Sequence, residues 1–127
     1  MSFFVKNIQE ETLNNSYFRK VLVTSKHSQL VVMCLQPNEE IGMEVHDNVD
    51  QFIRIETGAG KAILDGQEFD LANDFAVVIP AGTNHNIINT SGIEEMKLYT
   101  IYSPANHPEG TIHKTKAEAD TAEKVGE

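Results

Sequence analysis

The chain has 127 residues, of which 40% are hydrophobic, and this length and composition predict one domain built around one core. Acidic residues outnumber basic residues by 19 to 10, so the formal net charge at pH 7 is -9. Such a charge works against binding to nucleic-acid phosphates or to an anionic membrane surface. We therefore expect a small-molecule ligand or substrate as the partner, no nucleic acid and no membrane.

The first residues lack the basic start and the longer apolar run of a secretory signal, and no stretch is long enough to span a bilayer. The single cysteine, Cys34, lies in the apolar segment LVVMCL, so no internal disulfide can form and a buried thiol is its expected role. These features predict a cytoplasmic protein.

The predicted elements, in chain order, are mostly short strands. Residues before Asn14 fit either a short helix or an edge strand. The segments that follow are rich in Val, Ile and Phe and are separated by turn signals: FRKVLVTS, SQLVVMCLQ, QFIRIETG, KAILDG, QEFDL, FAVVI, HNIIN and MKLYTIYS. Asp65-Gly66 is a strong signal for a two-residue hairpin. The pattern predicts an all-β sandwich or barrel whose core spans about residues 19–103.

The C-terminal segment TKAEADTAEKVGE has a different pattern. Thr115 is followed three residues later by Glu118, a capping-box arrangement that predicts a short helix over about residues 115–124. Its apolar face is thin, so we expect it to fray or to pack on the barrel or on a partner subunit. His107 and His113, in the segment before it, are expected to be solvated, and whether this tail covers a pocket is left open.

The stretch IPAGTNHNIIN contains a candidate functional histidine. Pro80 has no N–H to donate, so the apolar strand before it is expected to end, with a turn over Pro80 to Thr83. Gly82 permits a positive φ in that turn. In the strand that restarts afterwards, His85 and Ile87 are expected on one face.

Two polar motifs stand out in this part of the chain. The pattern P-x-G-x-x-H-x-x-x-N is made by Pro80, Gly82, His85 and Asn89. The pattern H-x-N-x-x-Q-x-x-x-x-x-x-G is made by His46, Asn48, Gln51 and Gly58. These patterns resemble the second and the first conserved motifs of the cupin superfamily, over about residues 36–102. The chain departs from the first motif because Asn48 and Gln51 stand where cupins usually have a second histidine and a glutamate.

The resemblance implies the cupin double-stranded β-helix, a jelly-roll barrel, as one domain over residues 1–127. The whole chain is similar to small single-domain bacterial cupins described as mannose-6-phosphate-isomerase-like, which also suggests a homodimer. It further implies a divalent metal ion at the barrel mouth (iron, manganese, nickel, zinc or copper). The residues implied as its ligands are His46, Asn48, Gln51 and His85.

Two imidazoles with amide donors are a weaker and less charged ligand set than the family usually has. A neutral set leaves the charge of the ion in place, which favours an additional anionic ligand. The first hypothesis is therefore a metal-binding cupin that acts on a small polar or anionic metabolite by isomerase, lyase or dioxygenase chemistry. The alternative is a metal-free cupin that binds or senses a small molecule without catalysis. The residues leave the substrate, the reaction and the catalytic groups open.

Strand alternation gives further expectations. If Gln51 faces inward, Arg54 faces outward, where an ion pair or a subunit contact is its expected role. Tyr99 and Tyr102 fall on opposite faces of the last strand, so at most one of them lines the barrel. The predicted core includes Met33, Phe75, Val77, Ile79 and Leu98.

Overall fold

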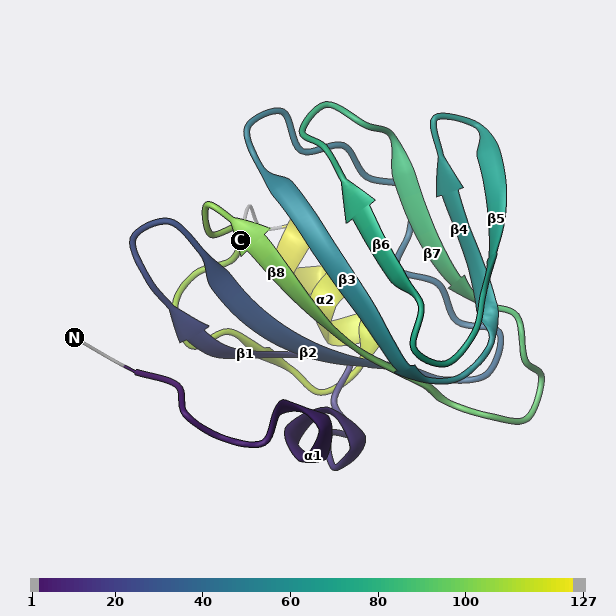
Figure 1. Ribbon diagram of the computed structural model, residues 1–127, viewed down its shortest axis with the longest axis horizontal. Helices are drawn as coiled ribbons and strands as arrows, with labels where there is room; N and C mark the ends of the chain where they lie inside the picture. Colours follow the sequence, from purple (N-terminus) through teal and green to yellow (C-terminus); the bar gives the residue numbers. More distant parts are fainter. Residues whose placement is uncertain (1–2, 125–127) are drawn as a thin grey trace.

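The computed structural model of the protein describes residues 3–124, in which two antiparallel β-sheets pack against each other (Figure 1). The elements in chain order are α1 (Ile8–Leu13), β1 (Arg19–Thr24), β2 (Gln29–Leu35), β3 (Asp50–Thr57), β4 (Gly60–Leu64), β5 (Gln67–Leu71), β6 (Ala76–Ile79), β7 (His85–Asn89), β8 (Met96–Ser103), β9 (Ile112–His113) and α2 (Lys116–Lys124). The larger sheet has the order β6-β3-β8-β2-β1-β9, and the smaller sheet has the order β5-β4-β7. The predicted all-β jelly-roll with a short C-terminal helix is confirmed.

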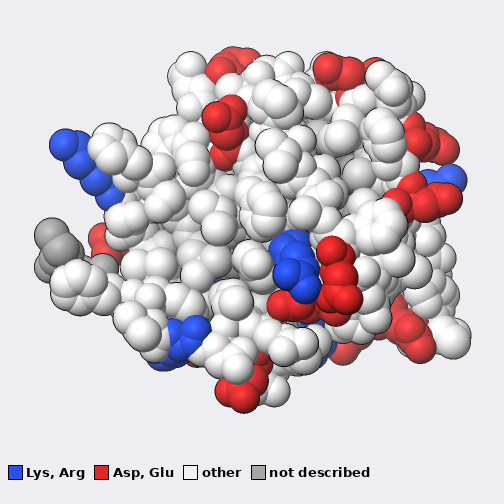
Figure 2. Space-filling view, viewed as in Figure 1, with Lys and Arg blue, Asp and Glu red and all other residues white. Residues whose placement is uncertain are grey.

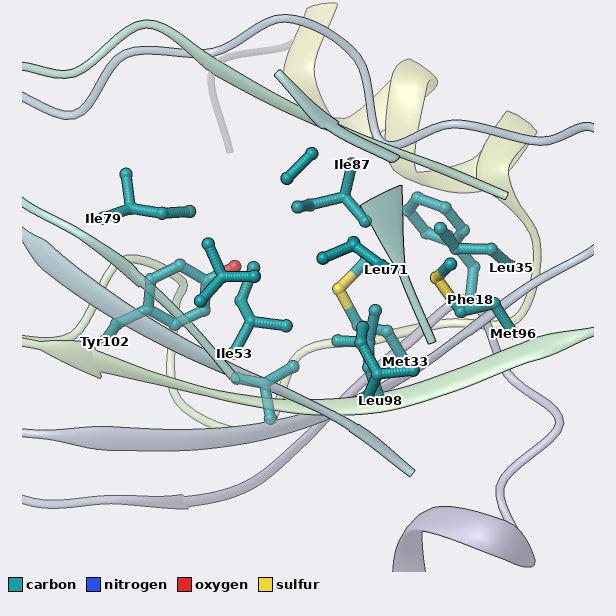
Figure 3. Close-up of a cluster of buried hydrophobic side chains, with 14 of the residues drawn as sticks. Phe18, Met33, Leu35, Ile53, Leu71, Ile79, Ile87, Met96, Leu98 and Tyr102 are labelled. Carbon is teal, nitrogen blue, oxygen red and sulfur yellow. The ribbon is translucent and has the colours of Figure 1, made fainter. Parts of the chain in front are cut away.

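The core fills the space between the sheets, and Figure 3 shows it running from Phe18 and Met96 at one end to Ile79 and Tyr102 at the other. It is built by alternation, because β8 buries every second residue from Met96 to Tyr102. Tyr102 is buried and Tyr99 is not, as alternation requires.

Four of the five predicted core residues are buried, namely Met33, Val77, Ile79 and Leu98. The prediction is wrong for Phe75, whose side chain is 49% exposed. Phe75 has the parity of the inward residues of β6, but it lies in the turn before that strand begins. Its ring therefore lines an apolar groove beside β5 and β6 and is not enclosed between the sheets.

Two tight turns are specified by local chemistry. Asp65 and Gly66 both have positive φ, 47° and 82°, and join β4 to β5 as the predicted two-residue hairpin. Gly82 has a φ of 85° in the turn between β6 and β7, and its N–H donates to the carbonyl of His46 at 2.8 Å. This second turn therefore connects the start of β7 to the segment that precedes β3.

Both terminal helices have side-chain caps. The N-terminal segment, for which a helix or a strand was open, forms α1, and the Asn7 side chain accepts from the N–H of Glu10 at 3.0 Å. At α2 the hydroxyl of Thr115 accepts from the N–H of Glu118 at 3.1 Å. Ala119 and Ala122 are buried, so α2 packs on the barrel, which was one of the three alternatives left open by the sequence.

The outer surface carries scattered charge. The face in Figure 2 shows acidic side chains distributed around it, with no continuous basic patch. The Arg54 guanidinium pairs with Asp74 at 2.9 Å, in agreement with the expected ion pair. Within residues 3–124, none of the helices is both long and apolar enough to cross a bilayer.

Asn89, the last residue of β7, connects three segments of backbone. Its side chain is fully buried, and Nδ2 lies within hydrogen-bond distance of the carbonyls of Leu35 at 3.1 Å, Gln36 at 3.0 Å and Glu94 at 2.8 Å. Its Oδ1 accepts from the N–H of Ser91 at 3.0 Å. This asparagine of the second motif therefore has a structural role at the end of the barrel.

We predict that Asn89→Ala lowers the free energy of unfolding by about 3 kcal/mol, because several buried backbone groups lose their partner at once. Urea unfolding followed by circular dichroism measures the change. Asn84→Ala removes an exposed asparagine of the same segment and is the matched control, with an expected effect within about 0.5 kcal/mol. Equal stability of the two variants would contradict the structural role of Asn89.

Candidate metal centre

Three side chains converge at the Tyr102 end of the barrel. One ligand atom from each of Glu44, His46 and His85 lies within 4.8 Å of the other two. Glu44 and His46 belong to the extended segment between β2 and β3, and they share a face because they are two residues apart. His85 is the first residue of β7.

Backbone hydrogen bonds hold these elements together. Glu44 and His85 form an isolated antiparallel bridge in which each N–H donates to the carbonyl of the other residue at 2.8 Å. Residues directly opposite in such a bridge present their side chains on the same side. The bridge therefore places the Glu44 carboxylate beside the His85 imidazole.

The orientation of the His85 ring is set by a second contact. Its Nδ1 lies 2.9 Å from the carbonyl oxygen of Thr83, which can only accept. Nδ1 therefore carries the proton, and Nε2 presents a lone pair. A backbone carbonyl that orients a histidine in this way is a common feature of metal sites.

The Nε2 atom of His46 is buried and lies 2.9 Å from Oε2 of Glu44, which is its one close polar contact among the described residues. Burial by itself raises the pKa of Glu44. The contact with His46 and the charges of Arg19 and His85 outweigh it, so the pKa of Glu44 lies below its usual value. Glu44 is therefore an ionised carboxylate at neutral pH.

A cavity of about 310 Å³ opens beside this group. Its lining includes Arg19 of β1, His113 of β9, His107 of the β8–β9 connection, and Ala122 and Glu123 of α2. The tail thus forms part of the wall of the pocket. The expectation that His107 and His113 are solvated is wrong: His107 is half-buried and His113 is 7% exposed.

The chain segment that carries His107 is fixed by a buried glutamine. The Gln29 side chain donates to the carbonyl of His107 at 2.8 Å and accepts from the N–H groups of Asn106 and His107 at 3.1 and 3.0 Å. Nε2 of His107 then lies 3.4 Å from the Tyr102 hydroxyl, whose ring packs edge-on against His46. Burial raises the pKa of Tyr102, so its phenol is protonated at neutral pH.

The structure brings two of the four sequence-predicted ligands, His46 and His85, into the group. Gln51 is buried on β3 opposite Tyr102, and its Nε2 donates to the Thr100 hydroxyl at 3.1 Å, while its Oε1 has no partner. Asn48 does not join them, because its side chain is exposed and does not line the cavity. The turn before β3 directs it to solvent.

Sequence reasoning missed Glu44 and Arg19. Glu44 could have been found, because a residue two before His46 in an extended segment shares its face. Arg19 carried no such signal, since its place in the cavity depends on the pairing of β1 with β9 across the whole length of the chain.

Comparisons with known proteins agree with this fold. A family described as "Cupin domain" matches residues 31–102. The protein YrkC of Bacillus subtilis (strain 168) is 50% identical over 94% of this chain and 67% of its own length. The crystal structure of BH2720 from Bacillus halodurans has a TM-score of 0.90 and 43% identity, covering 93% of both chains. TT1209 from Thermus thermophilus, at 20% identity and a TM-score of 0.69 over 79% of this chain and 96% of its own, shares the fold.

We predict an acid-sensitive contribution from His107. Burial, followed by the charge of Arg19, lowers the pKa of His107 from 6.5 to about 3, so the unfolded chain takes up a proton at mildly acidic pH that the folded chain does not. Neutral His107 contributes fully to stability above pH 6.5, and the contribution is lost as the pH falls toward 3. Between these limits the expected loss is up to about 1.4 kcal/mol per pH unit.

Urea unfolding at a series of pH values between 7 and about 4 tests this expectation, with His107→Gln as the variant. The wild type should lose stability more steeply than the variant as the pH falls. His27→Gln, which changes an exposed histidine, should follow the wild type. Parallel slopes for wild type and His107→Gln would show that His107 titrates normally.

Proposed function

The chain belongs to the cupin family, and we propose that it is a metal-dependent enzyme in which Glu44, His46 and His85 hold a divalent transition-metal ion. A small polar or anionic metabolite would react beside that ion. The observation that carries the proposal is the convergence of one carboxylate oxygen and two imidazole nitrogens within 4.8 Å of one another. Imidazole and carboxylate are donors suited to iron, manganese, nickel and zinc.

The donor atoms fit a cation. Nε2 of His46 is buried and points at the Glu44 carboxylate at 2.9 Å, and because Nδ1 of His85 donates to a carbonyl, Nε2 is the atom through which that ring would ligate a metal. Glu44 is ionised, which supplies the negative charge that the sequence alone did not reveal. A divalent metal requires a deprotonated carboxylate and neutral imidazoles as its ligands, and the low pKa of Glu44 meets the first of these conditions.

Gln51 is the candidate for a fourth donor. Its Nε2 is held by the Thr100 hydroxyl, so the amide is fixed and the unpartnered oxygen Oε1 is the atom left to accept. An amide oxygen adds a dipole to the site but no charge. One carboxylate then leaves a divalent ion with net positive charge, which favours an anionic ligand.

A bound metal would supply Lewis acidity or one-electron chemistry at the barrel mouth. Among isomerase, lyase and dioxygenase reactions, two histidines and one carboxylate favour the last, because this donor set with open positions is typical of non-haem iron oxygenases. The chain itself supplies a cavity beside the three side chains, a protonated phenol at Tyr102 and a neutral imidazole at His107. These two groups can exchange a hydrogen bond with a bound molecule without adding charge.

A metal-free binding protein is the second candidate, and one observation favours it. Glu44 and His46 approach each other to 2.9 Å, so they partly neutralise each other when His46 is protonated. In that case the cavity would hold a small molecule through hydrogen bonds alone. The homodimer expected from the family resemblance stays a prediction, which light scattering on purified protein would check.

We predict that untagged protein, purified without chelating columns, contains close to one equivalent of a divalent transition metal by inductively coupled plasma mass spectrometry. His85→Ala and Glu44→Gln should each lower the metal content at least tenfold, because each removes one of three donors. His27→Ala and Asp47→Asn are the matched controls, since both residues are exposed and lie outside the group.

Two results would count against this function. Full metal content in both His85→Ala and Glu44→Gln would place any metal elsewhere. Protein that stays metal-free after incubation with excess iron, manganese, nickel and zinc would favour the metal-free binding protein.

A further inference from the structure

Arg19 is a buried cation at the wall of the cavity. Its side chain is 2% exposed and lines the pocket together with Glu44 and His46. The chain has only one other arginine, Arg54, which is paired with Asp74 on the outer surface. An arginine keeps its charge even when buried, so Arg19 brings a permanent positive charge to this cavity.

The hydrogen bonds of Arg19 are incomplete. Its Nη1 lies 3.1 Å from Nδ1 of His113, the residue directly opposite on β9, and a guanidinium can only donate. Its Nε is buried and has no hydrogen-bond partner. The Phe18 ring lies 5.3 Å from the guanidinium carbon, and no carboxylate of residues 3–124 lies within ion-pair distance.

This arrangement is costly unless an anion completes it. A buried charge without a partner destabilises the fold, and one contact with an imidazole and one with a ring face compensate only part of that cost. With Nη1 used by His113, the buried Nε is the N–H group that lacks a partner, and Nη2 lies beside it on the same edge of the guanidinium. These two N–H groups point in parallel in one plane and match the two oxygens of a carboxylate.

We propose that Arg19 binds the carboxylate of a small substrate through its Nε–Nη2 edge. The substrate class is a small carboxylic acid with a second polar group, which is directed toward Glu44, His46 and His85. The cavity has a volume of about 310 Å³, which limits the ligand to a small molecule and fits this class. The direction of the second group rests on the proposed metal function, whereas the Arg19 contact does not.

Charge in the cavity couples the two sites. Glu44 and Glu123 are both acidic and line the same cavity as Arg19. When no metal is present, these side chains repel the carboxylate of a ligand. A divalent ion at Glu44 adds two positive charges and changes the net charge of the cavity from negative to positive. Carboxylate affinity is therefore higher in the metal-loaded protein, and by linkage the carboxylate raises metal affinity by the same factor.

The test uses the Arg side-chain N–H signals in nuclear magnetic resonance of ¹⁵N-labelled full-length protein. Because the chain has two arginines, there are two Nε–H signals, and Arg54→Gln identifies which belongs to Arg19. Malonate, a dicarboxylate, is the probe, added to metal-free protein and to protein loaded with zinc, which is diamagnetic. Inorganic phosphate is titrated in parallel.

We expect malonate to shift the Arg19 Nε–H signal and to slow its exchange with water, at lower concentrations when zinc is bound. The Arg54 signal should not move. In Arg19→Gln the malonate affinity of the zinc-loaded protein should fall at least tenfold while zinc content stays that of the wild type. Arg19→Lys keeps the positive charge but lacks the two parallel N–H groups, so its malonate affinity should lie between those of the wild type and Arg19→Gln. Arg54→Gln should bind malonate as the wild type does.

An unmoved Arg19 signal at saturating malonate would overturn the proposal, and this readout needs no variant of Arg19 itself to fold. A larger response to phosphate than to malonate would overturn the assignment to carboxylates. A shifted Arg19 signal in protein that binds no metal would support the carboxylate contact and refute the metal function. Zinc binding with an unmoved Arg19 signal would support the metal function and refute the carboxylate contact.

Discussion

The antiparallel bridge between Glu44 and His85 is the constraint on which the site depends. Two backbone hydrogen bonds of 2.8 Å join the segment before β3, which leads into the larger sheet, to β7 of the smaller sheet. The Gly82 N–H adds a third bond to the carbonyl of His46. Because the backbone of both segments is fixed, three side chains that could ligate a metal converge without any direct bond between them having to form.

Local sequence predicted the elements whose causes are local. Asp65 and Gly66 adopt positive φ as a two-residue hairpin requires, and Gly82 allows the turn that places His85 at the start of a strand facing inward. Alternation likewise separated Tyr102 from Tyr99. The prediction that Phe75 is buried was wrong because alternation holds only within a strand. No local signal showed that β6 begins one residue later.

The site was harder to predict than the fold because some of its residues are brought together only by pairing between distant strands. His46 and His85 were found from motif spacing, whereas the side chain of Asn48, which the same motif implied as a ligand, is exposed. Arg19 and His113 come together only when the last strand, two residues long, pairs with the first. No pattern near either residue specifies that partner, so a buried charge in the cavity was invisible in the sequence.

The two ends of strand β7 have different roles. The strand begins with His85, whose imidazole lies beside Glu44 and His46, and it ends with Asn89, whose amide connects three stretches of backbone at the opposite end of the barrel. Substitutions at the cavity end therefore leave the stabilising contacts of Asn89 in place. The two ends of one short strand can therefore diverge independently, because a change of donor atom at His85 removes none of the hydrogen bonds of Asn89.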